Sequence, residues 1–187
     1  LSAMAYSVFI CLVSGSDPLI KSQRRTQQPR TVLTTLKPNL DIKIVAHRGA
    51  SKFAPENTLP AITKAIELGA HYIELDIRSS NDGVPIVFHD RTVDRTTNGT
   101  GLVAELSLAE LQLLDAGSWF NPSFAGTRIP TLEDALQAMA GKACVLWDPK
   151  SAPTRAMVSV LKRYQFERGC LLVAFGPLGK TDDETVV

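Results

Sequence analysis

Residues 43–90 read KIVAHRGASKFAPENTLPAITKAIELGAHYIELDIRSSNDGVPIVFHD, and this stretch carries the clearest indication of the fold. Short apolar runs that are typical of buried parallel strands lie at 43–46, 72–77 and 84–88. Between the first two runs, residues 57–68 place apolar side chains at helical spacing, with Asn57 in the capping position and Gly69 after the last turn. The stretch therefore predicts a strand, a helix and two further strands.

The alternation of strands and helices continues toward the C-terminus. Two capping boxes, Ser107-Leu-Ala-Glu110 and Thr131-Leu-Glu-Asp134, each predict the start of a helix. Further strands are expected at 143–147 and 170–175, with a helix at 154–164 between them. Strands that alternate with helices in this way predict an α/β fold, in which helices cover a parallel sheet.

The expected strands are too few for a complete barrel. An eight-stranded (β/α)8 barrel needs about 250 residues, whereas residues 41–187 supply about five strands. An arc of five strands would leave an apolar edge unpaired. We therefore expect a TIM barrel that is truncated here to about five strands, with its C-terminal strands missing from this sequence.

The composition is that of a globular protein, and the charge differs between the N-terminal segment and the rest of the chain. Apolar residues make up 44% of the 187 residues, and the net charge of +1 gives no reason to expect nucleic-acid binding. Residues 1–40 hold five basic residues and one acidic residue, whereas residues 41–187 hold 15 basic and 18 acidic residues. We expect a signal-peptide remnant at 1–15, a basic linker at 16–40 and a partial barrel domain at 41–187.

The N-terminal apolar run bears on localisation. Residues 3–13 are too short to span a bilayer, which takes ~20 residues, and Ser14, Gly15 and Ser16 follow them. This pattern is typical of the end of a secretory signal peptide. We therefore expect an exported protein, periplasmic or extracellular, with no stable membrane span in the mature chain. The alternatives are a frayed apolar tail on a cytoplasmic protein and an uncleaved membrane anchor.

The three cysteines exclude a disulfide-based scaffold. Cys144 and Cys170 each begin an expected strand and are interpreted as small buried thiols, while Cys11 lies in the N-terminal apolar run. His71 precedes the second strand at its amino end, so we expect a surface or capping role for it rather than a catalytic one.

Acidic residues gather at the expected carboxyl ends of the strands, where parallel α/β proteins build their active sites. Glu74 and Asp76 are two residues apart on one strand, so their side chains share a face. Asp148 ends another strand on the same rim. The residues expected on the opposite face, against the helices, are Ile73, Leu75 and Ile77. Three carboxylates without a cysteine favour one divalent cation, Ca²⁺ or Mg²⁺.

Basic residues and imidazoles lie at the same rim. His47 and His89 end the first and third expected strands, and imidazoles with a pKa of ~6.5 suit proton transfer near neutrality. Arg48 and Lys150 add fixed positive charge beside the predicted cation. A cation, two proton-transfer groups and two anion-binding side chains fit the cleavage of a phosphoester, because charge builds on the phosphoryl oxygens.

These residues together resemble the glycerophosphodiester phosphodiesterase family. The resemblance rests on the motifs HRG, PEN, ELD, DG and HD within 47–90, on RTTNGTG at 95–101, on IPTLEDAL at 129–136 and on DPK at 148–150. It implies a TIM barrel with a small insertion after strand three, at 91–128. It also implies metal-dependent hydrolysis of glycerophosphodiesters, such as glycerophosphocholine, to glycerol 3-phosphate and an alcohol.

The resemblance implies a role for each matched residue. These roles are cation ligands for Glu74, Asp76 and Asp148, acid–base catalysis for His47 and His89, phosphate binding for Arg48 and Lys150, and support around the cation for Glu56 and Asn57. The family commonly has Glu-x-Lys where this chain has Asp148-Pro149-Lys150. Since aspartate is one methylene shorter, the cation would shift or a water would bridge to it.

Two other functions remain open. A related barrel enzyme of phospholipase D type would act on another head group, and pocket residues from the missing strands would decide this. An inactive fragment could instead serve as a binding module, for which loss of His47 or His89 would be the signature, and both are present.

Overall fold

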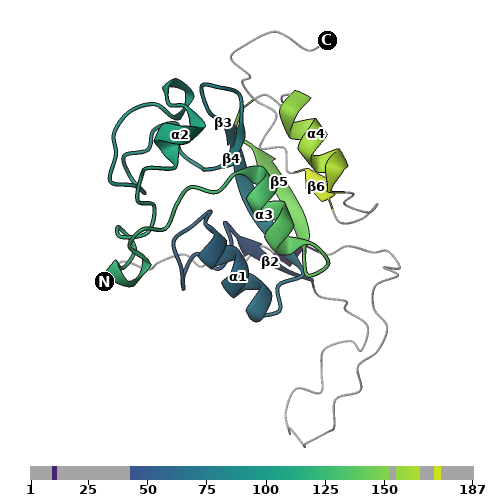
Figure 1. Cartoon of the computed structure of the whole chain (residues 1–187). Coiled ribbons are helices and arrows are strands. Elements are labelled where there is room, and N and C mark those ends of the chain that lie inside the picture. The colour runs from purple at the N-terminus through teal and green to yellow at the C-terminus, as the bar shows by residue number, and fades with distance from the viewer. Residues whose placement is uncertain (1–9, 12–42, 152–154, 165–170, 174–187) are drawn as a thin grey trace, which may run out of the picture.

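The computed structural model describes residues 10–11, 43–151, 155–164 and 171–173 (Figure 1). At its centre, parallel strands lie side by side in the order β2, β3, β5 and β6. The bounds are Lys43–His47 for β2, Tyr72–Ser79 for β3, Cys144–Pro149 for β5 and Leu171–Val173 for β6. A short strand, β1 (Ile10–Cys11), pairs antiparallel with β2. The parallel arrangement confirms the α/β class and is that of part of a TIM barrel.

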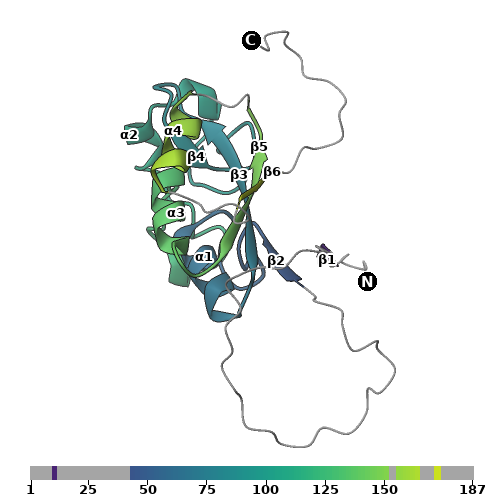
Figure 2. The same cartoon turned by 90° about the vertical axis from the view of Figure 1, so that its right-hand side faces the viewer.

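Helices cover one face of the sheet, as the side view shows (Figure 2). They are α1 (Leu59–Glu67), α3 (Leu132–Met139) and α4 (Arg155–Arg163). The residues of β3 that are fully buried in the core with these helices are Ile73, Leu75 and Ile77, as predicted. Burial of each such side chain contributes roughly 1.5–3 kcal/mol. Because side chains alternate along a strand, Glu74 and Asp76 lie on the opposite face.

Both predicted capping boxes form. The Ser107 hydroxyl accepts a hydrogen bond from the backbone N–H of Glu110, whose carboxylate accepts the backbone N–H of Ser107 at the start of α2 (Leu108–Leu111). Thr131 and Asp134 make the same reciprocal pair at the start of α3. Each box supplies acceptors to backbone donors that the helix itself leaves unpaired.

The first helix begins later than expected, and the prediction that Asn57 caps it is wrong. Thr58 occupies the N-cap position and makes no side-chain capping hydrogen bond. Asn57 has a left-handed backbone with φ +58°, and its side chain is hydrogen-bonded to Asp76 instead. Of the apolar residues at helical spacing, Ala61, Ile62 and Ala65 are buried, whereas Leu59 is 37% exposed.

The expectation of a third parallel strand at 84–88 is wrong. β4 (Pro85–Val87) pairs antiparallel with β3, so the two strands form a hairpin. The turn between them contains Gly83 in a left-handed conformation, φ +79°, and it is far too short for a parallel crossover, which takes a dozen residues or more. The chain therefore runs back along β3, and the Phe88 N–H donates to the Asp76 carbonyl at 2.9 Å.

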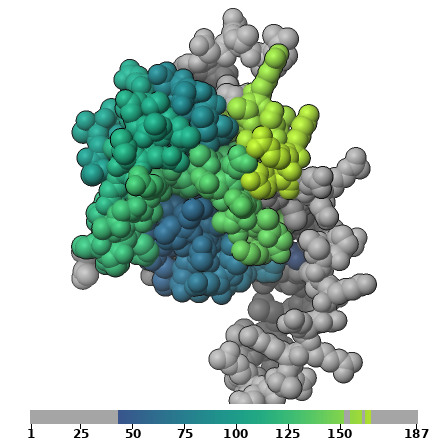
Figure 3. Space-filling view, in the orientation of Figure 1, coloured from purple at the N-terminus to yellow at the C-terminus, as the bar shows by residue number. Residues whose placement is uncertain are grey.

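The insertion at 91–128 follows this hairpin and has an apolar core of its own. It contains α2 and the 3-10 helices η1 (Val103–Glu105) and η2 (Pro122–Phe124). The buried residues of this second core are Ile86, Phe88, Val93, Val103, Leu111, Ala116 and Ile129. Because β4 contributes to it, the insertion packs directly onto the hairpin, and Figure 3 shows the teal insertion in contact with the rest of the molecule.

The remaining predictions concern the cysteines, His71 and the N-terminal segments, and their outcomes differ. Cys144 begins β5 as expected but is only half-buried, so the buried-thiol interpretation is wrong for it. His71 is exposed and its Nδ1 accepts the Ile44 N–H at 3.1 Å, in keeping with a surface role. Cys170, the linker at 16–40 and, apart from Ile10–Cys11, the segment 1–15 lie outside the described residues. Of the helices that the structure describes, none has the length and apolar character needed to cross a membrane.

Candidate active site

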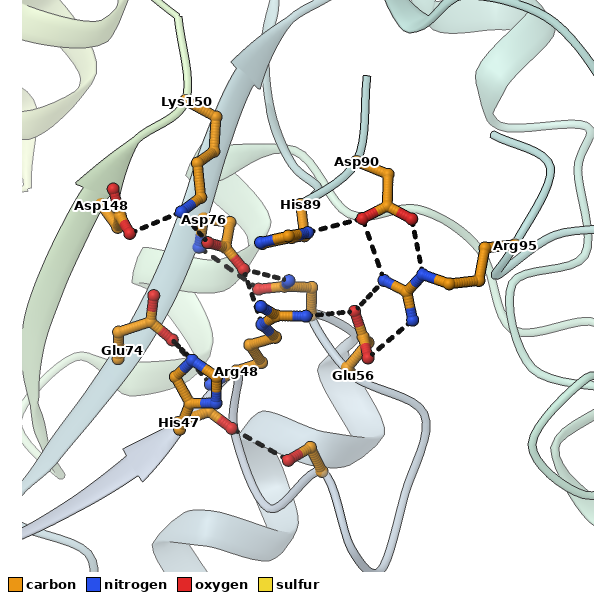
Figure 4. A network of polar contacts seen from close by, with 12 residues as sticks. His47, Arg48, Glu56, Glu74, Asp76, His89, Asp90, Arg95, Asp148 and Lys150 are labelled. Carbon is orange, nitrogen blue, oxygen red and sulfur yellow. Dashed lines mark hydrogen bonds and ion pairs between the residues drawn. The ribbon is translucent and has the colours of Figure 1, made fainter. Parts of the chain in front are cut away.

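The candidate site lies at the carboxyl ends of β2, β3 and β5 (Figure 4). Strand register sets its layout, because His47 lies beside Glu74 and Asp76 lies beside Asp148 in the ladder. Parallel pairing brings the ends of neighbouring strands to one rim of the sheet. The residues expected from separate motifs are therefore brought together by the sheet itself.

Glu74, Asp76 and Asp148 form a cluster that could bind a metal ion, and we call it the carboxylate cluster. One oxygen from each residue lies within 4.8 Å of the others. The side chains of Glu74 and Asp76 are 8% and 1% exposed, so water solvates them poorly. Oxygen ligands gathered in this way suit a hard cation such as Ca²⁺ or Mg²⁺.

The charge balance of the carboxylate cluster also fits a cation. Burial, followed by the charge of Asp76, raises the pKa of Glu74 to about 7, well above its ordinary value. Asp76 Oδ1 is buried, and the Lys150 ammonium lies 3.2 Å from it. An added divalent charge would favour ionised Glu74 and give this buried oxygen a second cationic partner.

Lys150 supplies one positive charge to the carboxylate cluster. Its Nζ donates to Asp148 Oδ2 at 2.6 Å and lies 3.2 Å from Asp76 Oδ1. Burial lowers the pKa of Lys150, but the hydrogen bond that it donates to Asp148 and the charge of Asp76 outweigh burial and hold the pKa above its ordinary value. The ammonium therefore remains charged at neutral pH, beside the predicted cation site.

Arg48 is held by a tight loop after β2. Arg48 and Gly49 are both left-handed, with φ of +55° and +75°, and a Cβ at Gly49 would come within 2.8 Å of Ala61. This bend directs the Arg48 N–H to Glu74 Oε2 at 2.8 Å. The guanidinium lies 3.3 Å from Asp76 and donates to Glu56 Oε1 at 3.0 Å.

The His47 imidazole stands at the edge of the carboxylate cluster. Its Nε2 is 3.8 Å from Glu74 Oε2, and its side chain is 37% exposed. Burial, followed by the positive charge of Arg48, lowers the pKa of His47 below its ordinary value. A neutral imidazole at pH 7 can accept a proton, which is what a general base requires.

Asn57 and Glu56 surround Asp76 and Arg48. Asn57 donates from Nδ2 to Asp76 Oδ2 at 2.8 Å, and its own N–H donates to the Arg48 carbonyl. Glu56 contacts the guanidinium of Arg48 and makes its other ion pair with Arg95. Asn57 thus supports a predicted cation ligand directly, while Glu56 supports it through Arg48.

His89 reaches the rim by the β3–β4 hairpin rather than by a parallel strand. Its Nδ1 lies 2.5 Å from Asp90 Oδ1, and Asp90 in turn accepts hydrogen bonds from Arg95. Sequence reasoning assigned no role to Asp90 or Arg95. A signal was present, however, since Asp90 ends the HD motif and Arg95 opens the RTTNGTG stretch.

Arg78 is a further residue that sequence reasoning missed. It is half-buried, and its guanidinium donates to the carbonyl of His89 at 2.8 Å and to that of Lys150 at 3.4 Å. It thereby connects the loop after β4 to the end of β5. Its position just beyond Asp76 on β3 offered no local pattern from which these contacts could be predicted.

A pocket lies beside these groups, between the sheet and the insertion. Its lining residues are Glu56, Asn57, Thr58, Val87, Phe88, His89, Thr96, Ala116 and Ile129. It therefore joins the wall of the candidate site to apolar side chains from the second core.

Comparison with known proteins identifies the family of this site. A model of the glycerophosphoryl diester phosphodiesterase family matches residues 47–181. The chain belongs to this family. The matched range contains every residue proposed above for the cation, the phosphate and proton transfer, which confirms the expected resemblance. Structures of the family are TIM barrels, and the described parallel sheet corresponds to part of one.

Individual family members agree with this assignment. A glycerophosphodiester phosphodiesterase of Caldanaerobacter subterraneus subsp. tengcongensis is 42% identical over 139 residues, which cover 71% of this chain and 57% of the relative. The crystal structure of a glycerophosphodiester phosphodiesterase from Agrobacterium tumefaciens is 43% identical with a TM-score of 0.68, over 71% of this chain and 57% of that one.

A third relative carries a bound molecule. An Oleispira antarctica phosphodiesterase, solved in complex with the product sn-glycerol-3-phosphate, is 37% identical with a TM-score of 0.64, over 69% of this chain and 55% of that one. The chain spans about half the length of the curated relatives it matches.

Proposed function

We propose that this chain supplies the cation-binding, phosphate-binding and proton-transfer groups of an enzyme that hydrolyses glycerophosphodiesters to glycerol 3-phosphate and an alcohol. The observation that carries the proposal is the carboxylate cluster, flanked at one rim by His47, Arg48 and Lys150 and faced by His89. Membership of the family supports the same reaction class.

Glu74, Asp76 and Asp148 would hold one divalent cation, Ca²⁺ or Mg²⁺. When bound, such a cation acts as a Lewis acid that stabilises negative charge on phosphoryl oxygens. Asn57 keeps the Asp76 carboxylate in place through its hydrogen bond, and the Arg48 N–H does the same for Glu74. The protein's own groups therefore orient the carboxylates before any cation binds.

Arg48 and Lys150 would bind the phosphate of the substrate. Both carry fixed positive charge next to Asp76, and their side chains are 19% and 25% exposed. As the reaction proceeds, negative charge grows on the phosphoryl oxygens. The guanidinium and the ammonium stabilise this charge more strongly in a partly buried site than they would in water.

The two imidazoles would move the protons. Hydrolysis breaks the bond between phosphorus and the oxygen of the departing alcohol, and phosphorus gains a hydroxyl from water. His47, whose pKa is lowered by burial, accepts the proton that this water loses. His89, whose ring the Asp90 carboxylate holds at 2.5 Å, donates one to the departing oxygen.

The substrate class rests on the relatives. The Oleispira antarctica phosphodiesterase binds sn-glycerol-3-phosphate as its product. A phosphomonoester of glycerol as product means that the substrate carries an alcohol on the same phosphate. For this chain, glycerophosphocholine is therefore a suitable first substrate to test.

The decisive experiment measures release of glycerol 3-phosphate from glycerophosphocholine with and without EDTA, followed by addition of Ca²⁺ or Mg²⁺. Activity should disappear with the chelator and return with one of the two cations. Glu67→Gln is a matched control, because Glu67 is an exposed acid at the end of α1. Activity that is indifferent to EDTA would contradict the metal assignment. Release of a lipid phosphate from a lysophospholipid, without action on glycerophosphocholine, would favour the phospholipase D-type alternative.

A further inference from the structure

The side chain of His89 is held by a second carboxylate that belongs to neither the carboxylate cluster nor the sheet. Asp90 Oδ1 lies 2.5 Å from His89 Nδ1. An ionised carboxylate can only accept a hydrogen bond, so Nδ1 must be the nitrogen that carries the proton in this contact. The other ring nitrogen, Nε2, faces the carboxylate cluster in Figure 4.

Asp90 is itself held from the opposite side by Arg95, at the start of the RTTNGTG stretch. Arg95 Nε donates to Asp90 Oδ2 at 2.5 Å, and Arg95 Nη2 donates to Asp90 Oδ1 at 3.1 Å. The hydrogen bonds from Arg95 outweigh burial and lower the pKa of Asp90 to about 2. Asp90 therefore stays ionised at neutral pH, as a carboxylate that must accept from His89.

The same guanidinium also binds Glu56. Its Nη2 donates to Glu56 Oε1 at 2.7 Å, and its Nη1 donates to Glu56 Oε2 at 3.2 Å. We call Glu56, Asp90 and Arg95 the Arg95 clamp. Since Glu56 also accepts from Arg48 at 3.0 Å, the Arg95 clamp connects the imidazole of His89 to the guanidinium predicted to bind phosphate. Figure 4 shows this chain of alternating charges.

We propose that Asp90 and Arg95 are positioning residues for His89: Asp90 selects the tautomer protonated on Nδ1, and Arg95 fixes Asp90 against Glu56, so that Nε2 is the atom that transfers the proton. The inference rests on the proposed function and deepens it by naming the reacting nitrogen. It also gives the start of the insertion a function in the site, because Arg95 belongs to that segment. Removal of an analogous orienting carboxylate elsewhere costs up to about 10⁴-fold in kcat.

The tautomer can be observed without any assay of activity. The full protein, labelled with ¹⁵N at histidine, is examined by long-range ¹H–¹⁵N NMR across a pH series, and the tautomer is taken from the signal of the neutral imidazole. His89→Gln assigns the signal. His89 should show a protonated Nδ1 and a bare Nε2. A wild-type His89 protonated on Nε2 would overturn the proposal, even in a fully active enzyme.

Variants then test the two positioning residues. Asp90→Asn should mix the two tautomers and lower kcat about 100-fold with little change in KM. Arg95→Gln should lower kcat about 10-fold, and Arg95→Lys should restore part of it, because lysine keeps the charge without the planar fork. Retention of the wild-type tautomer and kcat in Asp90→Asn would overturn the proposal.

Matched controls separate positioning from damage to the insertion. Asp94→Asn changes an exposed acid of the same loop that accepts from the Gly101 N–H, and Arg91→Gln changes an exposed arginine. Both should leave kcat and the His89 signal unchanged, and circular dichroism should show that every variant is folded. A wild-type protein that releases no glycerol 3-phosphate would contradict the proposed function, while the NMR signal would still decide the tautomer.

Discussion

The carboxylate cluster and the Arg95 clamp both contain acids, yet their electrostatics are opposite. In the carboxylate cluster, burial and like charges raise the pKa of Glu74 to about 7. In the Arg95 clamp, hydrogen bonds from an arginine lower the pKa of Asp90 to about 2. The first group is short of positive charge and suits a cation, whereas the second already contains its own counter-charge.

The two groups also differ in how the chain builds them. Glu74, Asp76 and Asp148 come from adjacent strands whose pairing register places them together. The members of the Arg95 clamp come from two loops, one between β2 and α1 and one after β4, and Arg95 is 46% exposed. A strand position is determined by its ladder, whereas a loop position depends on packing of the whole insertion. The comparison suggests substitutions that should affect one group and spare the other.

Asp76→Asn should have the largest effect. Asp76 faces the predicted cation and contacts Arg48, Asn57 and Lys150. Loss of its charge should lower kcat/KM by at least ~10²- to 10³-fold, the range seen when one charge-stabilising group is removed. It should also weaken Ca²⁺ or Mg²⁺ binding in calorimetry. Glu67→Gln, on the exposed end of α1, should change neither quantity, and normal cation binding by Asp76→Asn would contradict the cluster's role.

Stability should fall with rising pH in the cation-free protein because of Glu74. Its folded-state pKa of about 7 lies above the ordinary value of 4.5. The contribution is therefore fully present below about pH 4.5 and is lost as the pH rises through about 7, at a cost of about 3 kcal/mol. Chemical denaturation across pH 4–9 measures the loss. Glu74→Gln should flatten the curve, and added Ca²⁺ or Mg²⁺ at pH 8 should restore stability to the wild type alone.

Gly49→Ala tests the loop that joins the two groups through Arg48. Gly49 has φ +75°, and an added Cβ would lie 2.8 Å from backbone and side-chain atoms of Ala61. Gly69 is the matched control, since it has φ +80° with open space around it. Gly49→Ala should cost about 1–3 kcal/mol more in unfolding free energy than Gly69→Ala, because only the first adds overpacking. Equal losses would mean that the backbone angle alone matters.

Asp90 should make the smallest contribution to the pH dependence of stability. Its contribution changes with pH in the opposite direction to that of Glu74. Its folded-state pKa of about 2 lies below the ordinary value of 3.8. Its contribution is present above about pH 4 and is lost as the pH falls toward 2. Because the Arg95 side chain is 46% exposed and water screens the pair, we expect at most about 1–2 kcal/mol. The difference in unfolding free energy between wild type and Asp90→Asn should shrink over this range, and a constant difference would contradict the ion pair.

Local sequence patterns predicted much of the fold and the cluster. Alternation along β3 placed Glu74 and Asp76 on the face away from Ile73, Leu75 and Ile77, because side chains on a strand alternate. The capping boxes at Ser107 and Thr131 act within one helical turn, so their partners are adjacent in sequence. Such features need no knowledge of distant residues.

The predictions for Asn57 and for the strand at 84–88 were wrong because each local sequence pattern is compatible with two structures. Asn57 is a good capping residue, but its side chain is taken by Asp76, which is distant in the sequence. The apolar run at 84–88 fits a strand of either direction, and the short turn at Gly83 makes it antiparallel. The antiparallel hairpin still brings His89 to the rim, although the sequence predicted that a parallel strand would do so.

By itself, the sequence determined the α/β class and the family, and it predicted the carboxylate cluster together with His47, His89, Arg48 and Lys150, because these depend on residue type and short-range spacing. Only the tertiary structure decided that Arg95 reaches across to Glu56 and Asp90, and that Arg78 connects His89 to Lys150. The contacts of Arg95 with Glu56 and of Arg78 with Lys150 join residues that are 39 and 72 positions apart in the chain. Long, flexible arginine side chains can reach many partners, and packing of the insertion on the hairpin selects among them.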